Sequence, residues 1–294
     1  MKKSFNRGIL NDSDMKSVGN KIIYFAIIAI LVLLSVIVVV PMVWILLSGF
    51  KDVQEMYEIP TRFFPKKIEL SKLGRIWNEM KFYKFYLNTF IMAGGSVAAT
   101  VIVDGLAGYT LSRLRPVGSK IMMGLLFSLM LMPGTMRTVP IYMTFKSFSF
   151  LKLNLLDSFV PIWIMAGADI FSIIMFKNFF DEIPDSLVEA ANIDGAKNMT
   201  IFFKIIVPLS VPIIMTVAIF CFNGQVGQFF WPYLLIGDQN KTVIGVQLYK
   251  MKSGNYTTDY QMLAILFSLI PQVIIFLFFQ RYIIGGVNAG GVKG

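Results

Sequence analysis

Six long apolar runs divide this sequence and constrain its fold more than any other feature. They cover residues 22–48, 86–111, 120–145, 156–180, about 207–230 and 261–282. Each run supplies the roughly 20 residues that a helix needs to cross about 30 Å of hydrocarbon. A helix pairs its own backbone N–H groups, and the runs are too continuous for the alternating strands of a barrel. The sequence therefore predicts an all-α membrane protein with six transmembrane helices.

The first run is expected to remain in the mature chain. It is longer than the apolar core of a cleaved signal peptide, and no small-residue cleavage site follows it. Because proline disrupts a helix interior, we expect this span to be broken or kinked near Pro41.

The composition excludes several kinds of chemistry. The chain is 56% hydrophobic and only 15% charged, below the roughly 25% of soluble chains, so lipid is the expected solvent. It has no His and a single Cys, Cys221, which excludes a His/Cys zinc site, an internal disulfide and His-dependent catalytic triads. No phosphate-binding G-x-x-x-x-G-K-[ST] loop occurs, so any ATP-driven work would be powered by another subunit. We expect no cofactor and no metal.

The polar segments set the expected organisation. The net charge of +10 is scattered between the apolar runs, which indicates anionic lipid headgroups as its partner and not nucleic acid. Lys and Arg are nearly balanced across the two sides, so the orientation depends on the basic N-terminal tail, which favours the inside. The expected parts are a cytoplasmic tail over 1–21, a transmembrane domain over 22–282 with outer loops 49–85 and 236–260 and an inner loop 181–206, and a cytoplasmic tail over 283–294.

The polar segment between the fourth and fifth runs, residues 181–208, contains residues typical of the start and the end of a short helix. Pro184 suits a first helical turn, acidic residues surround it, and Gly195 is a natural stop. We expect a helix over about 184–194, then a second short helix leading to Pro208, which begins the next span. Small side chains would let another surface approach closely. From composition alone the segment fits a docking surface or an amphipathic loop lying on the membrane equally well.

A spacing pattern in this segment resembles a known motif. Glu189-Ala190-Ala191, three residues, Gly195, nine residues and then Ile205-x-Val207-Pro208 resemble the EAA loop of ABC importer permeases, which usually have Leu where this chain has Val207. The loop continues as PLSVP, and the chain closes with FFQRYIIGGVNAGGVKG. With these features the sequence resembles the sugar-type, MalG-like permease subunits of maltose and oligosaccharide importers across almost its whole length.

The resemblance implies a non-catalytic permease that passes a carbohydrate, an oligosaccharide, across a bacterial cytoplasmic membrane by alternating access. Its implied partners are a second permease in a heterodimer, two cytoplasmic ATPase subunits and an extracytoplasmic solute-binding protein that meets loop 236–260. The implied ATPase-coupling residues are Glu189, Ala190, Ala191, Asp194 and Gly195. A tail that reaches between the ATPase subunits is implied for Gly290, Gly291, Val292, Lys293 and Gly294, the alternative being a frayed glycine-rich terminus.

Polar residues inside the spans have two interpretations each. Asn223, Gln225 and Gln228 lie among aromatic residues, which suits a sugar path, but amides also bond neighbouring helices to one another. Asp104, Arg137 and Asp169 are costly at bilayer depth, so Arg137 is expected to pair with one of the acids or these residues line a cavity. Two overlapping small-xxx-small patterns, Gly94-xxx-Ala98 and Gly95-xxx-Ala99, predict close helix packing.

Three alternatives stay open at this point. A permease of the same superfamily would carry a solute other than sugar. A self-contained secondary transporter would need no ATPase and would leave the EAA-like loop without a role. An intramembrane enzyme could use Asp104 and Asp169 as a carboxylate dyad.

Overall fold

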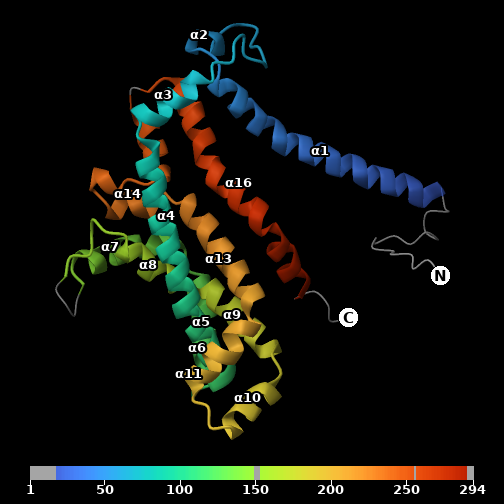
Figure 1. Cartoon of the computed structure of the whole chain (residues 1–294), viewed down its shortest axis with the longest axis vertical. Coiled ribbons are helices and arrows are strands. Elements are labelled where there is room, and N and C mark those ends of the chain that lie inside the picture. The colour runs from blue at the N-terminus through green and yellow to red at the C-terminus, as the bar shows by residue number, and fades with distance from the viewer. Residues whose placement is uncertain (1–17, 149–152, 255, 290–294) are drawn as a thin grey trace. The chain divides into compact units, whose positions relative to one another are not determined.

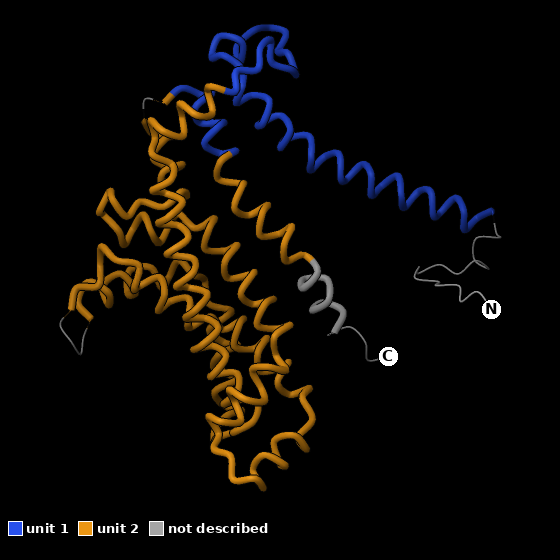
Figure 2. Tube along the Cα trace, in the orientation of Figure 1, with its two compact units in different colours: residues 1–70, 257–266 blue, residues 71–256, 267–294 orange. Residues whose placement is uncertain are grey.

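The computed structural model describes residues 18–148, 153–254 and 256–289, with side chains placed up to residue 280. Over these residues the secondary structure is helical, apart from an isolated antiparallel bridge between Phe148 and Leu153. The predicted all-α fold is therefore confirmed. The chain divides into two compact units, one of residues 1–70 with 257–266 and one of residues 71–256 with 267–294 (Figure 2).

Three helices are individually long and apolar enough to cross a membrane. They are α1 (Val18–Gly49), the composite helix Phe82–Leu114, and the stretch Thr258–Gln280 of α16 (Thr258–Ala289). Three bent helix pairs also pass the same test, and counting each as one span gives up to six spans. The six predicted runs agree with this count. The expected break in the first span is absent, because α1 continues through Pro41 to Gly49.

The bent pairs show where the runs are not single helices. α6 (Ser119–Met130) and α7 (Thr138–Lys146) meet at 101°, α8 (Val160–Ala166) and α9 (Ile170–Glu182) at 43°, and Asn198–Leu209 and α13 (Val211–Val226) at 80°. Pro133 explains the first bend, because it cannot continue a helix, and the 3₁₀ turn η4 (Gly134–Arg137) follows it. Pro208 lies in α12 (Val207–Leu209), and the next span's helix begins after it, at Val211. Pro208 therefore lies beside the 80° bend of this helix pair, and its place at the start of the span stays a prediction.

Short helices complete the fold. They are α2 (Val53–Met56), α3 (Ser71–Glu79), α10 (Asp185–Ile193), α11 (Asn198–Ile201), α14 (Phe230–Leu235), α15 (Ile244–Ser253) and the 3₁₀ turn η6 (Gln239–Lys241).

In the first unit, the chain after α1 is held by buried charged groups. Lys51 is 1% exposed, and its Nζ donates to the Arg62 carbonyl at 2.5 Å. The Glu55 carboxylate accepts from the Lys66 amide at 2.7 Å. The Lys66 ammonium also donates to Glu58 and holds the pKa of that carboxyl below its usual range. The segment that follows the first span is thus a folded loop.

In the second unit, one long helix organises the packing. It comprises α4 (Phe82–Ala99), the π turn η2 (Thr100–Asp104), α5 (Gly105–Tyr109) and the π turn η3 (Thr110–Leu114), and it runs along the unit (Figure 1). A Cβ at Gly95 would lie 2.2 Å from the Trp163 indole, and one at Gly167 would lie 3.3 Å from Ala99. The Gly95-xxx-Ala99 face therefore packs tightly against α8. Gly94 has no such neighbour within 4 Å, so the predicted packing holds for the Gly95 face and is wrong for Gly94.

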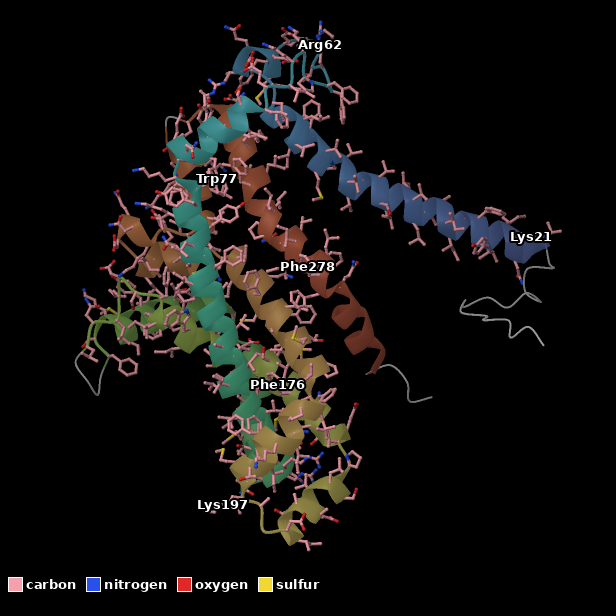
Figure 3. All side chains as sticks on the ribbon, in the orientation of Figure 1. Lys21, Arg62, Trp77, Phe176, Lys197 and Phe278 are labelled. Atoms are coloured by element: carbon pink, nitrogen blue, oxygen red, sulfur yellow. The ribbon has the colours of Figure 1, made fainter. Side chains whose placement is uncertain are left out.

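Two apolar clusters fill this unit. One gathers around α8, α14 and α15 and consists of Met92, Phe145, Ile162, Leu235, Ile236, Val243 and Val246. The other lies between α5, α9 and the chain that leads into α13, and consists of Tyr109, Phe176, Phe180, Ile183, Ile201, Phe202, Ile206 and Val217. Figure 3 labels Phe176 in the second cluster and Lys197 in the turn at the end of the unit. This second cluster supports the segment that carries the candidate site.

Candidate functional site

Helix α10 occupies the polar segment in which a helix over 184–194 is predicted. It follows Pro184, carries Asp185 in its first turn and reaches its C-cap at Asp194. Gly195 adopts φ +77°, the left-handed conformation that favours glycine. No atom lies within 4 Å of a Cβ built on it, so the backbone angle and not the available space requires glycine there.

Two hydrogen bonds close the end of α10. The Gly195 amide donates to the Asn192 carbonyl at 3.0 Å, and the Ala196 amide donates to the Ala191 carbonyl at 2.9 Å. This pair is a Schellman motif, which satisfies carbonyl groups that the end of a helix would leave unpaired. The motif fixes the direction in which the chain leaves α10.

The helix has a packed face and an exposed face. Val188, Ala191 and Ala196 pack against the cluster around Phe180 and Phe202. On the exposed side, the side chains of Leu187, Ile193 and Met199 are 42%, 87% and 59% exposed, respectively. Figure 1 places α10 and α11 at the end of the unit. Exposed apolar side chains on α10 and α11, in a polar segment, suit a protein-docking surface.

The five predicted coupling residues lie on α10 and its cap. Glu189, Ala190, Asp194 and Gly195 are exposed, whereas Ala191 is half-buried against the cluster. The structure thus brings the first four to the surface and gives Ala191 a packing position. The predicted tail residues 290–294 lie outside the described residues.

A basic residue that we did not single out from the sequence anchors α10. The Arg113 guanidinium, with a side chain 5% exposed, donates to the Asp185 carboxylate and to the carbonyl oxygens of Phe180 and Ile183. It therefore joins the C-terminal end of the long helix to the end of α9 and the start of α10. The sequence offers only one signal for this role, which is that Arg113 follows directly after the second apolar run.

Two further contacts hold the same segment. The Ser112 hydroxyl donates to Asp181 Oδ1 at 2.6 Å, while the Lys177 ammonium contacts Asp181 Oδ2 at 2.5 Å. On the far side of α10, the Tyr109 hydroxyl donates to the Asn198 carbonyl at 3.3 Å. The long helix thus contacts the chain both before and after α10.

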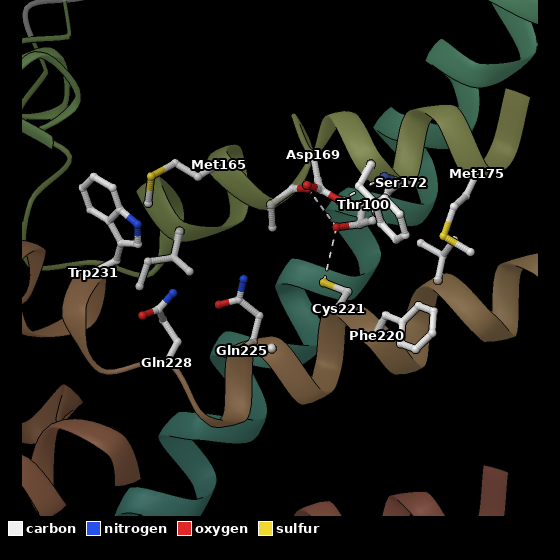
Figure 4. A pocket seen from close by; sticks show the side chains of 15 residues that line it. Thr100, Met165, Asp169, Ser172, Met175, Phe220, Cys221, Gln225, Gln228 and Trp231 are labelled. Atoms are coloured by element: carbon white, nitrogen blue, oxygen red, sulfur yellow. Dashed lines mark hydrogen bonds between the residues drawn. The ribbon is translucent and has the colours of Figure 1, made fainter. Parts of the chain in front are cut away.

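A cavity of about 410 Å³ lies between η2, α8, α9 and α13 (Figure 4). Gln225 and Gln228 line it, together with Thr100 and the indole of Trp231. The Gln225 Oε1 atom is buried and has no hydrogen-bond partner among the described residues, whereas the Gln228 Oε1 atom accepts from the Phe230 amide at 3.3 Å. Amide groups beside an indole ring can bind hydroxyl groups and the apolar face of a sugar ring.

Asn223, the third predicted path residue, is not among the residues that line this cavity. Its Oδ1 atom is buried without a hydrogen-bond partner among the described residues. The structure therefore brings together two of the three predicted residues.

A second cavity, of about 790 Å³, shares Asp169 and Trp231 with the first and is also lined by Arg137. Asp169 caps α9, because its Oδ2 accepts from the Ser172 amide at 3.0 Å and from the Ser172 hydroxyl at 2.6 Å. Asp104 is fully buried in η2. No ion pair between Arg137 and either acid is present in the described part of the chain, so that expectation is wrong. Arg137 and Asp169 follow the other expectation, because they line a cavity.

The described residues contain no group of three or more His, Cys, Asp or Glu side chains that could hold a metal ion.

Comparison with known proteins fits this geometry. Residues 83–288 match the model of the family described as "Binding-protein-dependent transport system inner membrane component". The diacetylchitobiose uptake system permease protein NgcG of Streptomyces coelicolor is 30% identical over 266 residues, which cover 89% of this chain and 86% of that protein. The polygalacturonan/rhamnogalacturonan transport system permease protein YtcP of Bacillus subtilis is 28% identical over 94% of this chain and 99% of its own length. The sn-glycerol-3-phosphate transport system permease protein UgpE of Escherichia coli is 28% identical over 87% and 93%.

A solved structure shows the same fold. It is a chain of a bacterial ABC transporter involved in the import of the acidic polysaccharide alginate, with a TM-score of 0.78 and 23% sequence identity. The match covers 90% of this chain and 98% of that one.

Proposed function

This chain belongs to the family of binding-protein-dependent transport system inner membrane components, and on that premise we propose that it passes an oligosaccharide across the cytoplasmic membrane. It does so as the permease subunit of an ATP-driven ABC importer. The chain itself carries out no reaction, and its work is alternating access biased by the nucleotide state of a partner.

The observation that carries this proposal is the exposed face of α10. The side chains of Leu187 and Ile193 are exposed on a helix that hydrogen bonds attach to the bundle at both ends. This geometry suits a helix that docks onto another protein. Glu189, Ala190, Asp194 and Gly195 surround these apolar side chains and form the rest of the contact with a cytoplasmic ATPase subunit. Ala191 supports the helix from behind. A self-contained secondary transporter would not need such a docking helix.

Two lines support a carbohydrate substrate. Two of the relatives are named for the uptake of diacetylchitobiose and of polygalacturonan/rhamnogalacturonan. The cavity lined by Gln225, Gln228 and Trp231 offers amide groups for hydroxyls and an aromatic face for a sugar ring. The relative named for sn-glycerol-3-phosphate favours a second candidate, a permease for a small phosphorylated solute.

The proposed assembly contains a second permease, two ATPase subunits and an extracytoplasmic solute-binding protein. The outer loop 236–260 is the surface offered to the binding protein. Its first part is tied to α4, because Asn88 Nδ2 donates to the carbonyls of Asn240 at 2.7 Å and Thr242 at 2.9 Å. The tail Gly290 to Gly294 is proposed to reach between the ATPase subunits.

A charge reversal on α10 tests the proposal. The complex is reconstituted in liposomes with its binding protein, and uptake of radiolabelled oligosaccharides is measured beside ATP hydrolysis. Glu189→Lys should abolish uptake while the permease stays folded, because the change places a positive charge within the proposed ATPase contact. Asp52→Lys is the matched control, since Asp52 is exposed and lies in the loop after α1, far in sequence from α10. Normal uptake by Glu189→Lys would refute the docking role of α10.

A further inference from the structure

The C-terminal end of the long helix is joined to the connection between α9 and α10 by polar contacts, in addition to the apolar packing. Ser112 and Arg113 are consecutive residues of η3, and between them they bind atoms of Phe180, Asp181, Ile183 and Asp185. These four partners form the hinge through which α9 passes into α10. We call Ser112, Arg113 and their four partners the hinge clamp.

Arg113 is the central member of the hinge clamp. Its side chain is 5% exposed, whereas that of its carboxylate partner Asp185 is 73% exposed. One guanidinium amine donates to Asp185, and the other donates to both backbone carbonyls. A planar guanidinium with five fixed donors can hold three acceptors in one orientation, which a lysine ammonium on a flexible stem cannot do equally well. The hinge clamp therefore fixes the orientation of α10 relative to the long helix as well as the distance between them.

The same helix reaches the cavity. Thr100, thirteen residues before Arg113 in the sequence, lines the cavity, and its hydroxyl donates to the Ala166 carbonyl at 2.9 Å. At the helical rise this separation is about 20 Å. Between the two points, Gly108 lets α5 approach the α9 backbone so closely that a Cβ there would lie 2.7 Å from Phe176 Cβ. The helix is thus a packed rod with the clamp at one end and the cavity wall along its length.

We propose that Arg113 is a positioning residue that makes α10 and the long helix move as one body, so that a displacement of α10 reaches the cavity wall at Thr100. This inference rests on the proposed function. Without the guanidinium, α10 still presents Leu187 and Ile193 to a partner, but the hinge between α9 and α10 turns freely. ATP is then hydrolysed without moving the solute.

The test separates docking from transmission. Arg113→Gln is compared with Arg62→Gln, whose native guanidinium pairs with Glu58 in the loop after α1. Three quantities are measured on the reconstituted complex: the ATPase subunit retained on purification, the rate of ATP hydrolysis, and the amount of oligosaccharide moved per ATP. A purely structural role would lower the yield of complex and leave the ratio of solute to ATP unchanged.

We expect Arg113→Gln to retain the ATPase subunit while the solute moved per ATP falls by roughly tenfold or more, the scale of losing a hydrogen bond to a charged group. Arg113→Lys should fall between it and wild type, and Arg62→Gln should match wild type. A wild-type ratio in Arg113→Gln overturns the proposal. If Arg113→Gln does not assemble, Arg113→Lys and Asp185→Asn decide, and a wild-type ratio in both overturns it equally. Failure of the wild-type complex to bind any ATPase subunit would overturn the proposed function itself.

Discussion

Replacing Gly195 by alanine should loosen the end of α10 without creating any clash. Gly195 has φ +77°, and a Cβ added there meets no atom within 4 Å. The cost is therefore confined to holding an L-residue in the left-handed conformation, about 1–2 kcal/mol. That free energy corresponds to a factor of roughly 5–30 in the population of the closed cap.

The same substitution at Gly118 is the matched control. Gly118 also has a positive φ, +89°, and a Cβ built on it also meets no atom within 4 Å. Unlike Gly195, however, it is the N-cap of α6 and lies outside α10 and its cap. Both variants carry the same kind of backbone strain. Only Gly195→Ala should affect the coupling of uptake to ATP hydrolysis. Gly195→Asn should have a smaller effect, because Asn tolerates the left-handed region better than Ala.

Hydrogen exchange gives the direct assay. The Ala196 amide, which donates to the Ala191 carbonyl at 2.9 Å, reports the closed cap. Its exchange should accelerate by roughly 5–30-fold in Gly195→Ala, because exchange follows local opening. Uptake per ATP should fall in the same variant. Unchanged exchange at Ala196 together with unchanged uptake would refute the cap as the element that fixes α10, and an equal loss of uptake in Gly118→Ala would show that the effect is not specific to α10.

Two further predictions follow from the packing and the cavity. Gly95→Ala places a Cβ 2.2 Å from the Trp163 indole and should lower the stability of the permease by about 1–3 kcal/mol, measured as a lower Tm in detergent. Gly94→Ala, where a Cβ meets no atom within 4 Å, should leave the Tm unchanged. Equal Tm values for the two variants would contradict the packing of Gly95 against Trp163. Gln225→Ala should raise the KM for oligosaccharide uptake and leave the solute moved per ATP as it was, while Asn223→Ala, whose side chain does not line the cavity, should leave the KM unaltered; an altered KM in Asn223→Ala alone would place the path elsewhere.

The boundaries of α10 could be predicted because local chemistry sets them. Pro184 stands at the N-cap in an extended conformation, directly before the first helical residue Asp185, and Gly195 ends the helix through its positive φ. The apolar runs were equally readable, since lipid demands internally paired backbone over a fixed length. The local signals succeeded at these two positions, whereas Pro41 did not break α1.

Directions and long-range pairs could not be predicted in this way. The 101° bend after α6 depends on what the chain packs against beyond Pro133, and mean hydropathy carries no direction. In the sequence, Arg113 stands next to an apolar run, where a basic residue usually indicates membrane orientation. Its acceptors at Phe180, Ile183 and Asp185 lie about 70 residues away, so the sequence does not reveal these contacts. The ion pair expected for Arg137 is absent among the described residues because this side chain is exposed and lines a cavity, so it has no need of a counter-charge.

The contact between α10 and an ATPase subunit is the central claim, and cross-linking tests it most directly. Ile193, 87% exposed on α10, is replaced by Cys in a Cys221→Ser background, the new thiol is labelled with a benzophenone maleimide, and the purified complex is irradiated. A covalent adduct between this chain and an ATPase subunit is the predicted result. A complex that contains the ATPase but yields no adduct at Ile193, or only adducts with lipid or with the second permease, would contradict the account.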